Sequence, residues 1–394
     1  MRQFVVASVI GTRPEAIKML PLIRALASIP AIAQKIVFTG QQPGLASMMK
    51  LDTETIHLPH VPGKAPVGQS RWRLRAMIAA QIKRSGPDLL LVHGDTTSAV
   101  AGALAAWDRG VPIGHVEAGL RSFDPRAPWP EEGNRIVIDR MADLLFAPTS
   151  DAADNLLDDH LVKGRIFITG NTGIDALFAA RDSTRKPPPS AERTLVVTCH
   201  RKENQGRRTR DICTALIAIA DRLPVSIAFP LHANPAVRRP IEQMLGGHPR
   251  IRLLEPLTYR EMVRLMTQSW AILTDSGGLQ EEGTALGRPV LVLRDVTERG
   301  EAIASDNIRL VGTDPDRIFA EVGALCANPT RYRAMSMPSL TFGDGRAAPR
   351  IASIIAEWLA RCENSRALPL PAQPISANDL DHDDAMVSRQ LEAV

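Results

Sequence analysis

Short apolar runs alternate with amphipathic stretches along most of the chain. In the first half the apolar runs predict strands at Phe4–Ile10, Lys35–Thr39, Asp88–His93, Pro112–Val116 and Leu144–Ala147. Helical spacing of apolar residues marks the intervening segments, including Glu15–Ala27, Gln69–Arg84 and Ser98–Arg109. Continuous apolar strands separated by amphipathic helices are typical of a parallel sheet covered on both faces.

The same alternation restarts after residue 193. The second half predicts strands at Thr194–Thr198, Ser226–Phe229, Arg252–Leu254, Ala271–Thr274 and Pro289–Leu293. Residues 181–193, which contain Pro187-Pro188-Pro189, have the composition of a linker. We therefore predict an α/β protein with two doubly wound, Rossmann-like domains, at 1–180 and 194–345, and a cleft between them. Residues 366–394 lack an apolar period and predict a disordered tail.

Composition narrows the class of protein. The net charge is only +4 and aromatic residues make up 4%, so the chain has neither the basic patch nor the stacking surface typical of nucleic-acid binding. No window holds eighteen uninterrupted apolar residues, which predicts no membrane insertion. The first apolar run is too short for a signal-peptide core, so we expect a cytoplasmic protein. The four cysteines are widely spaced and predict buried thiols without a metal site.

Polar residues follow three strands of the first half. Arg13 comes after the first strand and before a helix, while Asp95 and Glu117 follow the strands ending at His93 and Val116. Ligands of open α/β sheets bind beyond the carboxyl ends of the strands. We therefore expect these three side chains to face one cleft.

In the second half, Ser276-Gly277-Gly278 lies between a strand and the helix predicted at Leu279–Leu286. Glycines before a helix N-terminus suit a phosphate, although a plain tight turn has the same composition. Glu282 can reach a ribose hydroxyl pair or favour the helix dipole. The chain lacks both GxxxxGK[ST] and a GxGxxG after the first strand, which disfavours an NTPase or a dinucleotide enzyme.

The loop Asp124–Asn134 holds three prolines and then Glu131 and Glu132. Acidic residues are common in the first turn of a helix, so both a catalytic and a structural interpretation stay open. For His200 and His232, too, both a catalytic or binding role and a structural role stay open.

Eight segments taken together resemble the non-hydrolysing UDP-N-acetylglucosamine 2-epimerases. They span residues 1–360 in order and read GTRPEAIKM (11–19), VHGDTTS (92–98), GHVEAGLR (114–121), PWPEEGNR (128–135), FITGNTGIDAL (167–177), HRKEN (200–204), LTDSGGLQEE (273–282) and RDVTER (294–299). The resemblance implies a glycosyltransferase-B-type architecture, in which a C-terminal helix at 346–365 crosses back to the N-terminal domain.

The resemblance also implies an activity and a site. Members interconvert UDP-GlcNAc and UDP-ManNAc without a metal or NAD, eliminating UDP to a 2-acetamidoglucal and adding it back. They supply precursors of cell-surface polysaccharides and are commonly homodimers. By motif match the catalytic residues are Asp95, Glu117, Glu131 and His200. The substrate-binding set is Arg13, Lys18, Arg135, His232, Leu257, Met262, Ser276, Gly277, Gly278, Glu282 and Arg299.

Three other functions remain open at this point: a 2-epimerase for another UDP-2-acetamido sugar such as a 2,3-diacetamido uronate, a glycosyltransferase of the same architecture, and a catalytically silent UDP-sugar sensor.

Several positions depart from the family pattern. Gln42 replaces the usual His in a region that contributes to an activating second substrate site, and Gly300 replaces a Pro. Leu340-Thr341-Phe342 replaces Asn-Pro-Tyr, and Met262 stands where many members have a Phe near uracil.

Overall fold

The chain divides into two compact units, each built on a parallel sheet. The computed structural model describes residues 2–60, 67–125, 128–182, 193–297, 299–304 and 306–364. The first unit combines Met1–Ala176 with Gly343–Val394, and the second is Leu177–Phe342. Most of the predicted linker and all of the predicted tail at 366–394 lie outside the described residues.

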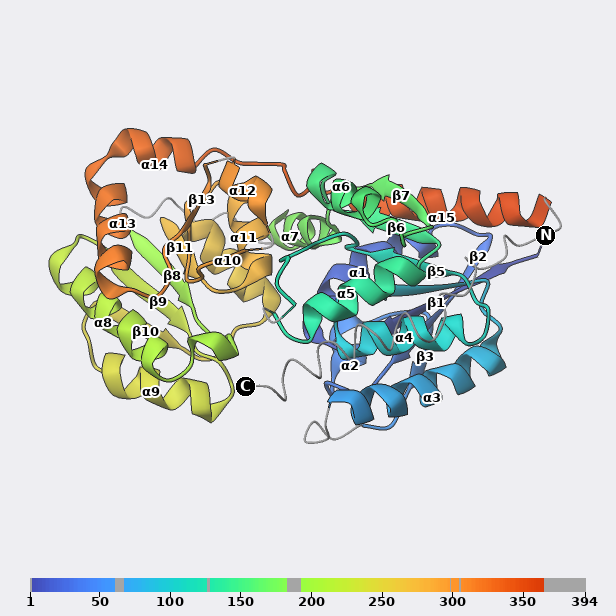
Figure 1. The fold of residues 1–394 in the computed structure, drawn as a ribbon. Coiled ribbons are helices and arrows are strands. Elements are labelled where there is room, and N and C mark those ends of the chain that lie inside the picture. The colour runs from blue at the N-terminus through green and yellow to red at the C-terminus, as the bar shows by residue number, and fades with distance from the viewer. Residues whose placement is uncertain are drawn as a thin grey trace. The chain divides into compact units, whose positions relative to one another are not determined.

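The first unit holds a seven-stranded sheet in the order β3-β2-β1-β4-β5-β6-β7, with every pairing parallel (Figure 1). Its strands are β1 Phe4–Ile10, β2 Ile32–Phe38, β3 Glu54–His57, β4 Leu89–His93, β5 Ile113–Val116, β6 Leu144–Ala147 and β7 Arg165–Ile168. The strand order reverses between β1 and β4, which is where open α/β sheets bind ligands.

Helices cover both faces of this sheet because successive strand residues point to opposite sides. In β4, Leu90 and Val92 pack with the core under α3, α4, α5 and α6, while Leu89 and Leu91 pack with α1, α2 and α15. The helices of this unit are α1 Arg13–Ala27, α2 Leu45–Met49, α3 Val67–Ser85, α4 Thr97–Trp107, α5 Glu131–Met141, α6 Ser150–Asp158 and α15 Ala347–Asn364, and the boundary between the two units falls within α7 Thr172–Asp182.

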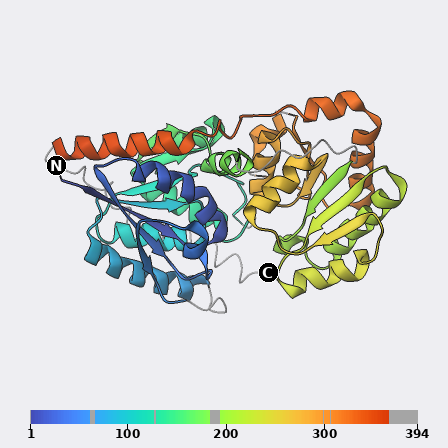
Figure 2. The same cartoon turned by 180° about the vertical axis from the view of Figure 1, so that it is seen from behind.

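The C-terminal helix α15 belongs to this first unit. Seen from behind in Figure 2, the red helix runs along the unit beside the blue α1, and the two helices are in contact. Ile351, Ile355 and Trp358 of α15 are buried in the shared core. Asp175 of α7 accepts hydrogen bonds from the first two amides of α15, Ala347 N at 3.1 Å and Ala348 N at 2.9 Å.

The second unit holds a six-stranded parallel sheet in the order β10-β9-β8-β11-β12-β13. Its strands are β8 Thr194–Thr198, β9 Ser226–Pro230, β10 Ile251–Leu254, β11 Ala271–Thr274, β12 Val290–Val292 and β13 Ile308–Leu310. Its helices are the 3₁₀ turn η1 Lys202–Asn204 and α8 Arg207–Arg222, α9 Pro235–Leu245, α10 Tyr259–Gln268, α11 Gly277–Ala285, α12 Gly300–Ala304, α13 Pro315–Ala327 and α14 Pro329–Met335. The predicted fold class, two doubly wound parallel-sheet units, is confirmed.

Each predicted strand is present, and three further strands were not predicted. β3 and β7 lie at the sheet edges and are only partly buried, so they show no continuous apolar run. β13 has only three residues. β2 begins earlier than the predicted Lys35 because Gln34 is accommodated in the interior, where its amide donates to Ile23 O at 2.8 Å. Among the described helices, none has the length and apolarity needed to cross a membrane.

Replacing Asp175 with Ala is expected to lower the free energy of opening of the start of α15 by about 1 kcal/mol, as for loss of a helix N-cap. The measurement is amide hydrogen exchange at Ala347 and Ala348, which is independent of how the two units unfold. Asp182→Ala, an exposed position at the end of the same helix α7, is the matched control. Unchanged exchange at both amides in the Asp175 variant would contradict this role.

Candidate functional site at the strand ends

The loops after β1 and β4 are joined through a buried glutamate. Glu15 accepts hydrogen bonds from Gly11 N at 2.9 Å and Thr12 N at 2.6 Å, and its other oxygen accepts one from Thr96 Oγ1 at 2.5 Å. Burial raises the pKa of Glu15, and these donors oppose that rise. Any side chain at Gly11 would meet Ser98 Oγ at 1.9 Å, so the loop packs against α4 without room for a Cβ.

Glu117 follows β5 with a left-handed backbone, φ 69°. A non-glycine residue in that conformation stores strain and is typical of a functional site. Two hydrogen bonds fix the turn, because Glu117 N and Ala118 N both donate to Phe146 O at 3.1 Å. The local backbone is therefore set by the neighbouring strand β6.

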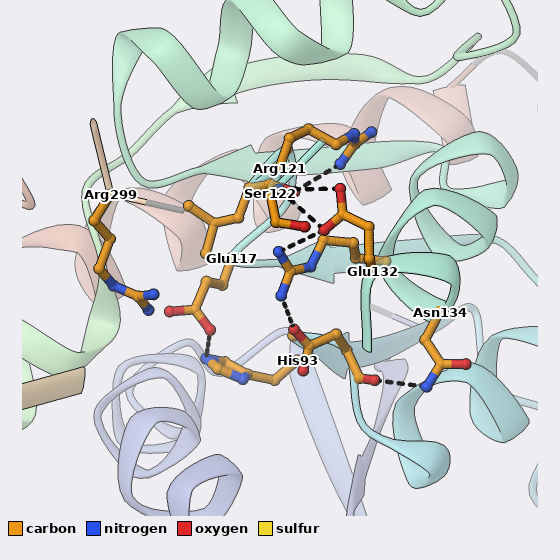
Figure 3. A network of polar contacts seen from close by, with 12 residues as sticks. His93, Glu117, Arg121, Ser122, Glu132, Asn134 and Arg299 are labelled. Atoms are coloured by element: carbon orange, nitrogen blue, oxygen red, sulfur yellow. Dashed lines mark hydrogen bonds and ion pairs between the residues drawn. The ribbon is translucent and has the colours of Figure 1, made fainter. Parts of the chain in front are cut away.

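The carboxylate of Glu117 is held by two donors on one oxygen. Lys18 Nζ lies 2.5 Å and Asn171 Nδ2 2.7 Å from Oε1. The Asn171 amide is oriented for this contact because its Oδ1 accepts from Gly173 N at 2.8 Å. His93 Nε2 lies 3.6 Å from the other oxygen, Oε2. Figure 3 shows the two side chains pointing toward each other.

Asp95 follows β4 and lies beside a buried arginine. Arg135 of α5 forms an ion pair with Asp95 Oδ2 and donates to Glu132 Oε2 at 3.0 Å. Asn134 Nδ2 donates to the Asp95 carbonyl at 2.8 Å (Figure 3). Since Arg135 and Asn134 are buried, α5 fixes both the backbone and the side chain of Asp95.

The adjacent glutamates at the start of α5 lie in different surroundings. Glu132 is buried and accepts hydrogen bonds from Ser122 N at 3.0 Å and Phe123 N at 3.2 Å, in addition to that of Arg135 (Figure 3). Glu131 is half-buried in the first turn. Glu132 is thus an internal structural carboxylate that holds the 121–123 loop, and Glu131 is the more accessible of the two.

A buried cluster centred on Asp139 lies beneath the loops after β4 and β5. Asp139 Oδ1 contacts His115 Nδ1 at 2.6 Å, and its Oδ2 accepts from Arg121 Nη1 at 2.6 Å and Gly119 N at 3.3 Å. His115 Nε2 in turn lies 2.9 Å from Gly94 O. Burial alone would raise the pKa of Asp139, but His115 and Arg121 lower it below its ordinary value.

In the second unit, Asp275 organises the loop that carries His200. The Oδ2 of Asp275, which is fully buried, accepts from His200 N at 2.9 Å, Arg201 N at 2.8 Å and Asn204 Nδ2 at 3.1 Å. The His200 ring lies parallel to the ring of His232, with centroids 6.0 Å apart. These two histidines, predicted separately, therefore lie side by side at the ends of β8 and β9.

The helix α11 begins at Gly277 beneath an arginine. A Cβ at Gly277 would lie 2.6 Å from Arg299 Nη1, so only glycine allows this approach. Arg299 Nε donates to Glu281 Oε1 at 2.6 Å, and both side chains are buried. The Arg299 guanidinium thus lies beside the backbone amides at the N-terminus of α11, and this combination of donors is suited to binding a phosphate.

Other predicted residues of the second unit surround α11. Tyr259 OH donates to Glu282 Oε1 at 2.9 Å, and Ser276 N donates to Thr274 Oγ1 at 2.9 Å. Leu257 and Met262 are half-buried near the start of α10, and Gly278 is half-buried in the first turn of α11. In the first unit Arg13 is exposed, and its amide donates to Gln42 Oε1 at 2.7 Å.

Sequence reasoning missed His93, Asn171, Asp139 and Asp275 as site residues. His93, Asn171 and Asp275 each come at or just after a strand end, and that position is a usable signal. Asp139 lies inside a helix and has no such signal, because its partners come from β5 and the following loop. The part of the chain that the structure describes contains no group of three or more His, Cys, Asp or Glu arranged to hold a metal ion.

Two parallel-sheet units, one with carboxylates at its strand ends and one with a glycine-started helix under an arginine, define an α/β protein of the glycosyltransferase-B class. Residues 24–356 match the family profile described as UDP-N-acetylglucosamine 2-epimerase. The chain belongs to this family.

Individual relatives agree with that assignment. The chain is 42% identical to UDP-N-acetylglucosamine 2-epimerase of Escherichia coli K12 over 364 residues, which cover 88% of this chain and 96% of the relative. It is similar in structure to the Neisseria meningitidis UDP-GlcNAc 2-epimerase bound to UDP-GlcNAc, with TM-score 0.85, 34% identity and coverage of 90% and 100% of the two chains. A Staphylococcus aureus protein solved with UDP gives TM-score 0.84 at 36% identity, covering 91% of this chain and 97% of that one.

Asp139→Asn is expected to destabilise the first unit by about 3–5 kcal/mol, because it leaves the buried Arg121 without a counter-ion. Since the folded-state pKa of Asp139 lies below its ordinary value, this stabilisation is complete above about pH 4 and declines as the pH falls. The difference from the wild type, measured by hydrogen exchange of α5 amides, should therefore narrow in acid. The exposed Asp154→Asn on α6 is the control, and a pH-independent difference would contradict the assignment.

Proposed function

We propose that this chain interconverts UDP-GlcNAc and UDP-ManNAc by inverting the C2 centre of the sugar. Family membership supports the activity, and one observation in the chain itself carries it: a glutamate in a strained backbone conformation has its carboxylate aimed by Lys18 and Asn171.

The chemistry explains why UDP must leave. The C2–H of a 2-acetamido sugar has no neighbouring carbonyl to make it acidic. As the C1–O bond to UDP breaks, positive charge grows at C1 and the C2–H bond becomes removable. Loss of the proton forms a C1–C2 double bond, giving a 2-acetamidoglucal, and addition of UDP with protonation from the other face completes the inversion. The overall reaction is redox-neutral, because the addition of UDP is the reverse of its elimination.

Carboxylates are suited to the proton transfers at C2. General bases and acids of this kind contribute about 10²–10⁴-fold in rate. In this proposal Asp95, Glu117 and Glu131 act at the sugar. Asp95 forms an ion pair with Arg135 and Glu117 one with Lys18, so each carboxylate is held in place by a cation.

The second unit supplies groups for the leaving diphosphate. The amides at Ser276–Gly278 and the Arg299 guanidinium are suited to its developing charge, and His200 can protonate or hydrogen-bond it. Glu282 then binds the ribose in competition with Tyr259, and His232, Leu257 and Met262 belong to the nucleotide end. Arg13 at the N-terminus of α1 adds a further cation for the diphosphate.

The test is proton NMR of the purified protein with UDP-GlcNAc in deuterium oxide, without added metal or cofactor. UDP-ManNAc should form and both sugars should carry deuterium at C2. A panel of other UDP-2-acetamido sugars is run in parallel, and fast exchange with one of them alone would transfer the proposal to that sugar. Absence of C2 exchange with the whole panel would overturn it.

The two glutamates of α5 give a matched pair of variants. Glu131→Gln should lower kcat by about 10²–10⁴-fold, because it removes a proton-transfer group, with little change in thermal stability. Glu132→Gln should instead lower the thermal midpoint, because it weakens the buried contacts with Arg135 and the 122–123 amides. The reverse pattern would move the catalytic role to Glu132.

We further propose a cytoplasmic homodimer. The family resemblance supports both statements, and light scattering of the purified protein tests the oligomeric state.

A further inference from the structure

His93, the last residue of β4, combines burial with an unused polar atom. Its Nε2 is inaccessible and makes no hydrogen bond to any described residue. Buried polar atoms nearly always have a partner, so an exception calls for an explanation. Oε2 of Glu117 lies 3.6 Å from this nitrogen, which is too long for a hydrogen bond in this state. Catalytic contacts are often this long without substrate and shorten in the complex.

The two oxygens of Glu117 are not equivalent. Oε1 accepts from the Lys18 ammonium at 2.5 Å and the Asn171 amide at 2.7 Å. A carboxylate oxygen with two such donors is a poor place for an incoming proton, since it would have to displace one of them. Oε2 faces His93 and the backbone of Gly94, where even a Cβ would come within 3.4 Å. The proton from C2 is therefore expected on Oε2.

His93 faces charges from several elements. Glu117 and Asp95 favour its protonated form, while Lys18 and His115 oppose it. Burial outweighs them all and lowers the pKa of His93 to about 4, so the imidazole is neutral at physiological pH. A neutral ring can donate to a carboxylate without adding a second full charge to that of Lys18.

We propose that His93 is a positioning residue for the reaction: its Nε2–H holds Oε2 of Glu117, the oxygen that exchanges the C2 proton. This inference rests on the proposed role of Glu117. In the elimination step the C2–H bond breaks and an Oε2–H bond forms. The C–H electron pair becomes the C1–C2 double bond, and the C1–O bond pair leaves with UDP. His93 gains and loses no proton; it orients the lone pair that accepts one.

Three variants test this role. His93→Met keeps the approximate volume but has no donor, His93→Gln places an amide N–H near the position of Nε2, and His93→Asn carries the same amide on a shorter chain. Each is measured for kcat, KM for UDP-GlcNAc, the pH profile of kcat and C2 deuterium exchange. The exposed His160→Met on the surface is the control.

His93→Met is expected to lower kcat by about 10-fold to 100-fold, the cost of a misplaced catalytic group, with KM nearly unchanged. The acidic limb of its kcat profile should move to higher pH, because the ionised Glu117 loses a donor. His93→Gln should recover most of kcat and return the limb toward its wild-type position. If His93→Met does not fold, the comparison of Gln with Asn serves in its place, since only the longer amide reaches Oε2.

Equal kcat and pH profiles for His93→Gln and its Met or Asn counterpart would overturn the proposal, as would a loss confined to KM. If the wild type and His93→Met exchange C2 deuterium equally fast, the role of His93 is refuted and the proposed function stands. A wild-type protein that shows no exchange refutes the proposed function instead.

Discussion

The carboxylate of Asp139 anchors the loops that carry Asp95 and Glu117 in the first unit. It binds His115, whose other nitrogen meets Gly94 O and so fixes the loop of Asp95. It also binds Gly119 N and Arg121, which fix the loop of Glu117 from the far side. Because Asp139 itself lies on α5, the helix that begins at Glu131 is tied to the same point. The segments that carry Asp95, Glu117 and Glu131 are thus all connected to one buried carboxylate.

Buried charges in this protein serve geometry more than stability. Ion pairs removed from water gain little net free energy, because the loss of hydration offsets their attraction. What they provide is direction: Lys18 aims Glu117, and Arg135 joins Asp95 to Glu132. In the second unit Glu281 aims Arg299 over the start of α11 in the same way. Exposed pairs such as Arg75 with Asp108 give no comparable constraint, since both side chains keep contact with water.

Much of this architecture can be predicted from the sequence. Strands buried on both faces produce continuous apolar runs, and their carboxyl ends locate Asp95, Glu117 and Ser276-Gly277-Gly278 without any relative for comparison. The edge strands β3 and β7 were not predicted, because half-buried strands lack such runs. Contacts between distant segments were not predicted for a different reason. That Asn171 aims Glu117, or that Glu132 and not Glu131 is internal, depends on side-chain directions that pattern alone does not specify. The catalytic roles still rest on the family resemblance.

The position of α15 has a consequence for how the protein is made. One face of the first sheet packs on Ile351, Ile355 and Trp358, residues that leave the ribosome after the whole of the second unit. At synthesis rates of about 5–20 residues per second, that apolar face stays without α15 for a time on the order of tens of seconds. The nascent chain therefore passes through a stage in which the second unit can be complete while the first is not. Chaperone dependence during translation, and sensitivity to codons that slow the last segment, should both arise from this one helix.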